Sequence, residues 1–472
     1  MGKDQLMAPP VAVLDQITVD VLRLGYRGEG VARYNGFTVF IDGALAGELV
    51  KVQISKVMRT FAVGKILSII RTSPQRETPP CEVFDLCGGC QLQHVSYDAQ
   101  LQFKQQTVKD ALERIGKFDS EVVRTLVLDT LLQSDPWRYR NKVSLMATAR
   151  SGRFVAGFVE EGTHEPIEAQ TCMIRPKAYD ELLHTITTNF TELGIRPYDE
   201  KNRRGDVRQL VIRSNNANEV MIVMITQGRE LPRAELFCKV LAERMPEGYR
   251  LVSVIQQKHS IAADSTEGQF IKERVLFGSP YMQEEIAGLT FRISASAFLQ
   301  VNPIQTLVLY EKALASAKLT KTDVVFDLFS GVGTLSLLAA RQAKAVYGVE
   351  SIRAATEDAT FNAKNNGLTN TQFLSGFVED IVPQLVSDRI CPDVVLLDPP
   401  RAGCAAQVLT ALIDLAPQRI VYISCNPATL ARDLRHLVDG GYVMTSIQPV
   451  DMFPQTAHVE VIASLLLHDV AQ

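Results

Sequence analysis

From about residue 304 onward, the sequence alternates between helical periodicity and short apolar runs that are typical of buried strands. The apolar runs lie near 323–327, 345–350, 371–375, 393–397, 419–424, 442–448 and 459–467. The helical stretches that precede or separate the first three runs are 304–317, 334–342 and 353–366. This alternation predicts a Rossmann-like, doubly wound α/β sheet for residues 301–472.

The N-terminal part of the chain has a different pattern. Residues 16–70 read as five short strands punctuated by glycines, which is typical of a small OB-like β-barrel, and a polar, proline-rich linker follows at 71–80. A helix is expected over 97–117, with Leu101, Phe103, Val108, Leu112 and Ile115 near one face, and residues 137–297 mix strands with helices. We therefore expect three domains, and their ranges are a barrel at 8–72, an α+β central domain at 73–300 and the doubly wound domain at 301–472.

The composition is that of a soluble globular protein, with 46% hydrophobic and 22% charged residues. No apolar stretch approaches the roughly 18 residues of a membrane helix, and the N-terminus lacks the apolar core of a signal peptide. We expect a cytoplasmic protein without membrane contact. The net charge of −4 argues against a protein coated in positive charge, although a local basic patch is enough to bind nucleic acid.

Two predicted strands end in reactive residues. The run at 394–397 is followed by Asp398-Pro-Pro-Arg401, and the run at 419–424 is followed by Cys425-Asn-Pro. Open α/β sheets hold their ligands at the carboxyl ends of strands. A thiol can add to C6 of a pyrimidine and so make C5 nucleophilic, but a base must then remove the C5 proton. Glu460 and His458, at the start of the last strand, are the candidate bases.

A third strand end predicts a nucleotide-type pocket. The strand at 324–327 runs through Asp327 into a turn that contains Phe329, Gly331, Gly333 and Thr334. The glycines let a ligand approach the backbone, and the helix N-terminus favours an anionic group. The next strand ends at Glu350, which can accept hydrogen bonds from ribose hydroxyls, and 376–380 is a candidate adenine rim. In this order and spacing, these elements predict bound S-adenosylmethionine.

Three cysteines, Cys81, Cys87 and Cys90, lie within ten residues, and Cys172 is the best candidate for a fourth ligand. Clustered cysteines in a large chain without a signal peptide are more often metal ligands than disulfides. Four cysteines suit either zinc or a [4Fe–4S] cluster, and their spacing does not choose between them.

Basic residues gather in two segments. Residues 137–142 interleave cations with aromatic rings, a combination that suits phosphate contact and base stacking on single-stranded RNA. Arg138, Arg140 and Lys142 are the candidate RNA contacts. A second basic run occupies 201–208.

These motifs together resemble the RNA uracil-C5 methyltransferase family, and most of all its iron–sulfur 23S ribosomal RNA branch. Residues 16–70 resemble a TRAM domain, and the four cysteines resemble that branch's [4Fe–4S] ligands. The most specific motifs are Asp398-Pro-Pro-Arg-x-Gly403, Ser424-Cys-Asn-Pro427 and Phe453-Pro-Gln-Thr-x-His-Val-Glu460.

The resemblance implies a reaction and a role for each site residue. The enzyme would transfer a methyl group from S-adenosylmethionine to C5 of a uracil in 23S rRNA and so form 5-methyluridine, with Cys425 as nucleophile and Glu460 as base. The RNA would be a single-stranded or loop segment with its target uridine flipped out, and the enzyme would be a monomer. Matched cofactor or target-base positions are Gln300, Phe329, Glu350 and Asp398, beside the turn residues Asp327, Gly331, Gly333 and Thr334. Thr334 and Phe377 or Val378 stand where the family has asparagines.

Three alternatives remain open from the sequence. The same reaction on a tRNA is the nearest, and the barrel and cysteines argue against it because the bacterial tRNA branch resembles only the remainder. Asp398-Pro-Pro-Arg401 is also similar to the motif of amino-group methyltransferases, which need no thiol. A catalytically idle RNA-binding protein is the third. Only the thiol mechanism requires Cys425.

Overall fold

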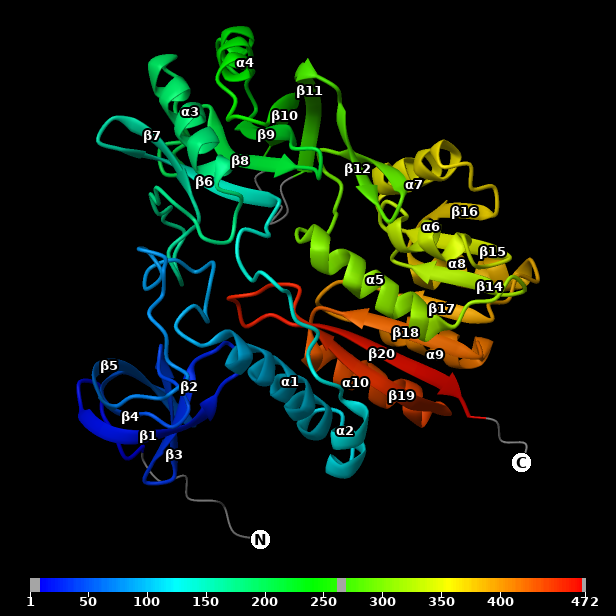
Figure 1. Cartoon of the computed structure of the whole chain (residues 1–472), viewed down its shortest axis with the longest axis horizontal. Coiled ribbons are helices and arrows are strands. Elements are labelled where there is room, and N and C mark those ends of the chain that lie inside the picture. The colour runs from blue at the N-terminus through cyan, green and yellow to red at the C-terminus, as the bar shows by residue number, and fades with distance from the viewer. Residues whose placement is uncertain (1–8, 261–268, 469–472) are drawn as a thin grey trace.

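The computed structural model describes residues 9–260 and 269–468. Figure 1 shows three bodies: an N-terminal barrel, a central sheet covered by helices, and a C-terminal sheet flanked by helices. Within the described residues, no helix combines the length and the apolar character that crossing a bilayer requires.

The N-terminal body is a closed five-stranded barrel with the strand order β1-β2-β3-β5-β4, which confirms the predicted OB-like architecture. Its strands are β1 Gln16–Leu24, β2 Gly30–Tyr34, β3 Phe37–Asp42, β4 Leu49–Val57 and β5 Phe61–Arg71. Alternate residues of these strands point inward and form an apolar core. The fully buried Glu48 accepts a hydrogen bond from Arg76 Nε at 2.6 Å, and this ion pair ties the barrel to the linker that follows it.

The central body is an α+β layer. Its sheet has the order β11-β10-β9-β8-β6-β7, and α3 and α4 pack together on it through a shared apolar core. The strands are β6 Lys142–Arg150, β7 Arg153–Gly157, β8 Val207–Ser214, β9 Glu219–Gln227, β10 Arg250–Ser260 and β11 Gln269–Gly278, and the helices are α3 Ala178–Glu192 and α4 Ala234–Glu243.

The C-terminal body is a seven-stranded sheet with the order β16-β15-β14-β17-β18-β20-β19. Strands β14 to β18 pair in parallel, whereas β20 runs antiparallel between β18 and β19. The strands are β14 Val324–Leu328, β15 Ala345–Glu350, β16 Thr371–Ser375, β17 Val394–Leu397, β18 Arg419–Ser424, β19 Tyr442–Val450 and β20 Glu460–Leu467. The helices are α5 Pro303–Ala317, α6 Thr334–Ala340, α7 Arg353–Asn365, α8 Val378–Ser387, α9 Ala406–Leu415 and α10 Pro427–Asp439. The predicted doubly wound sheet is confirmed.

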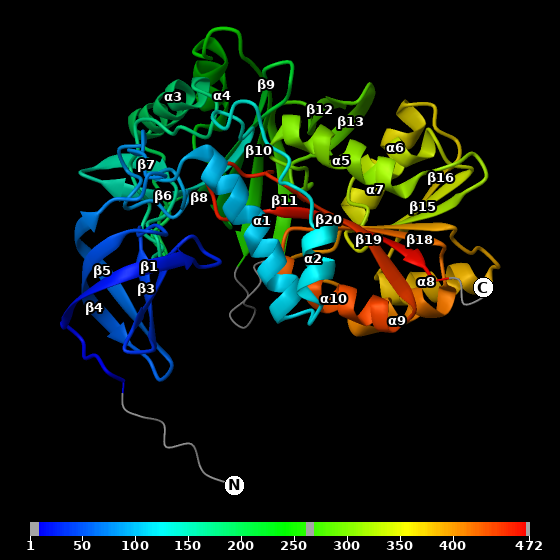
Figure 2. The same cartoon turned by 60° about the horizontal axis from the view of Figure 1, so that its bottom comes forward.

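Two segments that the sequence assigned to the central domain lie on the C-terminal body instead. Helices α1 Tyr97–Arg114 and α2 Ser120–Leu126 bury apolar residues in the same core as α10 and β19. Figure 2 shows α1 and α2 beside α10. The hairpin of β12 Tyr281–Ile286 and β13 Leu289–Ser294 joins the other face of that body. Both segments cover apolar faces of the C-terminal body. The spacing of apolar residues within each segment does not indicate that this body is its packing partner.

Candidate active site at the strand ends

The register of the C-terminal sheet brings three reactive residues to one edge. Leu397 at the end of β17 pairs with Tyr422 of β18, so Asp398 and Cys425 follow neighbouring strands. Ser424 pairs with Val461 of the antiparallel β20. Cys425 follows Ser424 and Glu460 precedes Val461, so the two residues flank the last pair of this ladder, and the Glu460 charge acts on the Cys425 thiol. Residues that are distant in sequence therefore meet at the carboxyl ends of the central strands.

The loop that carries Asp398 is docked on the start of α10. Asn426 caps that helix by accepting a hydrogen bond from Ala428 N, and its Nδ2 donates to Arg401 O at 3.0 Å. The fully buried Asp433 accepts hydrogen bonds from Cys404 N at 2.9 Å and Tyr422 Oη at 2.7 Å. These contacts fix the 398–404 loop against the segment that carries Cys425.

The acids and the thiol at this edge favour their protonated forms. Burial, reinforced by Asp327, raises the pKa of Asp398 to about 7. Burial and then the Asp398 charge raise the pKa of Glu460 well above its usual range, while Arg401 opposes the shift. Burial and the Glu460 charge raise the pKa of Cys425 to about 11, and Arg401 again acts in the opposite direction. Strongly perturbed groups in one cleft are typical of a catalytic site.

His458, whose role the sequence left open, lies beside Arg401. Both ring nitrogens of His458 are 3.4 Å from Arg401 Nη2, and the Phe453 ring stacks edge-on with its centroid at 6.2 Å. His458 as a residue is exposed, but protein atoms surround much of its ring. Partial burial and then the cations Arg401, Lys104 and Arg140 lower the pKa of His458 to about 4. At neutral pH the ring is therefore uncharged and can accept a hydrogen bond from Arg401.

The expected cofactor pocket forms the next part of the same edge. The turn after β14 holds Phe329 at φ 70°, a conformation that non-glycine residues rarely adopt, and Gly331 and Gly333 at φ 54° and 83°. Gly331 N donates to Glu350 Oε2 at 3.0 Å, so the acid at the end of β15 faces this turn. Thr334 begins α6, with Gly333 at its N-cap position.

Of the remaining predicted pocket residues, Asp327 and Gln300 are buried. Asp327 accepts a short hydrogen bond from Ser336 Oγ, and burial raises its pKa to about 7. Gln300 lies in the connection between β13 and α5, where it lines a small cavity with Asn141 and Glu284. Phe377 is 61% exposed at the start of α8.

The four candidate metal ligands Cys81, Cys87, Cys90 and Cys172 line one cavity together with apolar and aromatic residues. Gly89 N donates to Cys87 Sγ at 3.4 Å. Burial raises the pKa of Cys90 to about 12, and the other three thiolates add to that shift because they are close. Across the described residues, no three Cys, His, Asp or Glu side chains are placed as ligands of a single metal ion.

The three predicted RNA contacts have different surroundings. Arg138 points inward, where its Nη1 donates to Cys172 O at 2.6 Å and lies 3.5 Å from Asp180 Oδ2. Arg140 lies close enough to His458 to lower the pKa of that residue. Burial and two neighbouring arginines lower the pKa of Lys142 to about 8. Of these three residues, Arg140 is the one whose charge acts on His458 of the candidate site.

Sequence reasoning gave no role to three polar residues of this region. Arg401 was noted only as part of its motif, and Lys104 and Asp451 were not singled out. Lys104 and Asp451 form an ion pair in which both side chains are completely buried. The sequence does offer one signal for this pair, since Lys104 lies on the apolar face of the predicted helix at 97–117. A buried lysine needs an acidic partner.

Comparisons with known proteins find matches to both the N-terminal and the C-terminal parts of the chain. Residues 266–469 match the model of the tRNA (uracil-5-)-methyltransferase family, and residues 11–67 match the TRAM domain. An uncharacterized RNA methyltransferase of Halalkalibacterium halodurans is 43% identical over 470 residues, which cover 99% of this chain and 100% of the relative. Another, of Clostridium tetani, is 42% identical over 454 residues and covers 96% of each chain.

Among solved structures, the chain is similar to the tRNA (uracil-54, C5)-methyltransferase of Pyrococcus abyssi in complex with S-adenosyl-L-homocysteine. The identity is 26%, the TM-score is 0.75, and the similarity covers 95% of this chain and 99% of the other. All three bodies of the molecule thus have counterparts in that single structure.

Proposed function

This chain belongs to the uracil-C5 family of S-adenosylmethionine-dependent RNA methyltransferases, and from that premise we propose that it methylates C5 of a uridine in 23S rRNA through a covalent adduct with Cys425. The observation that carries the proposal is the sheet register, which places Cys425 after the end of β18, Glu460 at the start of the paired β20, and Asp398 after the end of the neighbouring β17. An amino-group methyltransferase has no use for a thiol and a buried acid in this arrangement.

Each step of the reaction has a residue to perform it. The thiolate form of Cys425 forms a bond from Sγ to C6 of the uracil, and the electron pair of the C5–C6 double bond moves toward C5. Bound S-adenosylmethionine would supply the methyl group on a positively charged sulfur, and S-adenosylhomocysteine would be left when C5 takes that group. The carboxylate form of Glu460 then removes the C5 proton, the double bond reforms, and the Cys425 thiolate leaves.

Arg401 favours the charged forms that this chemistry needs. Its guanidinium lowers the pKa of both Cys425 and Glu460, against the burial that raises them. Asp398, with a pKa of about 7, can donate or accept a hydrogen bond near neutrality, so it can orient the polar edge of the uracil ring. Phe329, Gly331 and Glu350 would hold the nucleoside part of the methyl donor.

We also propose that Cys81, Cys87, Cys90 and Cys172 bind a [4Fe–4S] cluster. Their position around one apolar cavity supports this, since four thiolates are the usual ligands of such clusters. Each thiolate of a cluster binds a different iron, so the sulfurs need not converge on one point as they do for zinc. Anaerobic purification followed by iron and sulfide analysis tests the assignment, with Cys90→Ala as the variant that should lose iron and Cys391→Ala, at an exposed cysteine, as the matched control.

Ribosomal RNA is the proposed substrate on the resemblance of the barrel and the cysteine set, and a tRNA is the second candidate. The similarity to the Pyrococcus abyssi enzyme extends over the whole chain, so domain organisation alone does not separate the two RNAs. Transfer of labelled methyl groups to unmodified 23S rRNA and tRNA transcripts decides between them. Methylation of tRNA and not of 23S rRNA would contradict the proposed substrate.

A further inference from the structure

The segment between β19 and β20, residues 451–459, leads into the candidate base Glu460 at the start of β20. Donors from outside the segment form hydrogen bonds with its backbone. Five consecutive carbonyl oxygens, those of residues 451–455, each accept such a hydrogen bond. In chain order the donors are Gln305 Nε2 at 2.9 Å, Asn302 Nδ2 at 2.9 Å, Lys104 Nζ at 3.0 Å, Tyr139 Oη at 2.9 Å, and the backbone N–H groups of Gln91 and Leu92 at 3.1 and 3.0 Å. A loop would normally satisfy most of these carbonyls with water.

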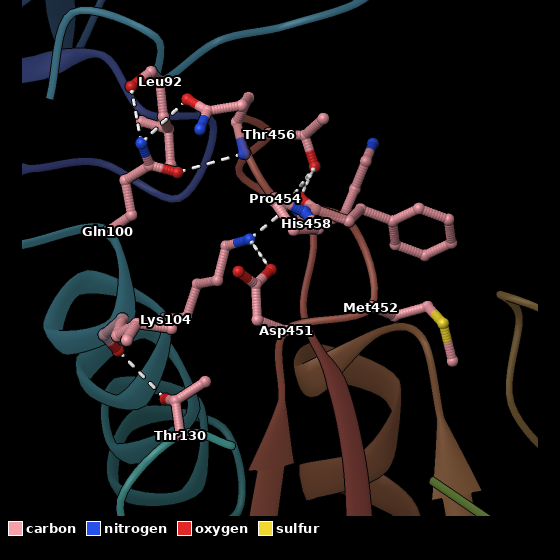
Figure 3. Close-up of polar contacts among 12 residues, drawn as sticks. Leu92, Gln100, Lys104, Thr130, Asp451, Met452, Pro454, Thr456 and His458 are labelled. Atoms are coloured by element: carbon pink, nitrogen blue, oxygen red, sulfur yellow. Dashed lines mark hydrogen bonds and ion pairs between the residues drawn. The ribbon is translucent and has the colours of Figure 1, made fainter. Parts of the chain in front are cut away.

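The centre of this arrangement is the buried ion pair of Lys104 and Asp451. Figure 3 shows the Lys104 ammonium from α1 pointing at the Asp451 carboxylate. Tyr97 Oη donates to the second oxygen of that carboxylate at 2.7 Å. Lys104 therefore holds the segment twice, through the Asp451 side chain and through the Phe453 carbonyl.

Gln100 of α1 also forms hydrogen bonds with Gln455, a residue of the same segment that has an unfavourable backbone conformation. Gln455 has φ 69°, the left-handed region that disfavours side chains. Gln100 forms two hydrogen bonds with it, from Gln100 Nε2 to Gln455 Oε1 and from Gln455 N to Gln100 Oε1, both at 3.0 Å. Residues in such conformations persist only where their surroundings enforce them, and they are enriched at functional sites.

The held segment leads directly to the reactive groups. Asp451 follows Val450, which pairs with Glu460 across the β19–β20 ladder. The Phe453 ring packs on His458, which in turn lies against Arg401. Displacement of 451–455 would thus move the groups around the C5 proton without touching Cys425 or the turn after β14.

We propose that Lys104 and Asp451 are positioning residues that place Glu460 for removal of the C5 proton, acting through the backbone of residues 451–455. The inference rests on the proposed function, because it assumes that Glu460 is the base. It assigns to α1, a helix from outside the doubly wound sheet, a role in one step of the reaction. Addition of the thiol and transfer of the methyl group precede that step.

The test measures covalent protein–RNA adduct on ordinary uridine RNA, using the transcript that the wild-type protein methylates. Glu460→Gln sets the scale, since it should stop the reaction after methyl transfer and accumulate a denaturant-resistant adduct. Lys104→Met should lower kcat about 10-fold or more, leave the KM for S-adenosylmethionine within about twofold, and accumulate the same adduct. Arg124→Met, which removes the exposed ion pair of α2, is the matched control and should behave as wild type.

The outcomes separate the two proposals. No adduct with Glu460→Gln would overturn the proposed mechanism and this inference with it. Adduct with Glu460→Gln but none with Lys104→Met, together with activity that falls only as the folded fraction falls, would overturn the positioning role alone. Should Lys104→Met fail to fold, the double variant Lys104→Met/Asp451→Leu replaces the pair by apolar side chains and should fold. Adduct in the double variant supports the role, and its absence overturns it.

Discussion

A buried acid lies at each end of the connection between β19 and β20, and the two acids differ in their neighbours. Asp451 is completely buried beside the ammonium of Lys104 and the hydroxyl of Tyr97. Glu460 and Asp398 are instead buried beside each other, and their pKa values are raised. A buried acid with a cationic partner holds structure in place, whereas buried acids that face one another can exchange protons near neutral pH. The comparison therefore distinguishes Asp451, an acid that positions the backbone, from Glu460 and Asp398, acids that can take part in the reaction.

The largest effect is expected for substitution of Glu460, the candidate base. Glu460→Gln removes the base, so kcat should fall by roughly 10²- to 10⁴-fold. Stability should not fall, because burial opposes the carboxylate form of Glu460 and the glutamine amide carries no charge. Steady-state methyl transfer and a thermal melt at neutral pH measure both. Wild-type activity in Glu460→Gln would remove Glu460 from the mechanism.

The next largest effect is expected for substitution of Asp451, and the quantity affected is the free energy of unfolding. Asp451→Asn leaves Lys104 buried without a counter-charge, which should reduce the free energy of unfolding by about 3–5 kcal/mol. Urea denaturation at pH 7 measures it. Arg124→Met, which breaks an exposed pair, should change that free energy by less than about 1 kcal/mol. Equal losses in the two variants would contradict the structural role of the buried pair of Lys104 and Asp451.

A smaller effect of opposite sign is expected for Asp398→Asn. The pKa of Asp398 is raised from 3.8 to about 7 in the folded protein, so its stabilising contribution is present below pH 4 and is lost as pH rises through 7. At pH 8 the variant avoids burying a carboxylate, and it should be more stable than wild type by on the order of 1 kcal/mol. Urea denaturation at pH 8 and pH 5 tests this. A gain at pH 5 that equals the gain at pH 8 would show that the charge of Asp398 is not the cause.

Much of the fold follows from local patterns in the sequence. The alternation after residue 304 predicts the strands that became β14 to β18, because each is a short apolar run that ends at a turn. Glycine spacing likewise predicts the barrel. The place of β20 between β18 and β19 has no local signal, since antiparallel insertion depends on pairing between strands that are not neighbours along the chain. Cys425 and Glu460 could therefore be singled out from their motifs, but the pairing of the two strands that they flank could not.

Helix α1 shows most clearly where sequence reasoning stops. Of the residues that its apolar periodicity places near one face, Val108 and Leu112 are buried, whereas Ile115 is 47% exposed. The same face buries Gln100 and Lys104, whose partners lie 355 and 347 residues away. A polar residue within an apolar face does not indicate a partner so far away in the sequence. For Arg138 the local pattern suggests the wrong partner. An arginine among aromatic residues suits RNA, yet its guanidinium donates a hydrogen bond to the carbonyl of Cys172.

The most direct test of the central claim uses a 23S rRNA transcript that contains 5-fluorouridine, incubated with the protein and S-adenosylmethionine. Fluorine at C5 cannot be removed as a proton is, so the covalent intermediate should be trapped. The account predicts a denaturant-resistant protein–RNA adduct that needs the methyl donor and is absent in Cys425→Ala. An adduct that persists in Cys425→Ala, or methyl transfer to ordinary RNA by that variant, would contradict the thiol mechanism.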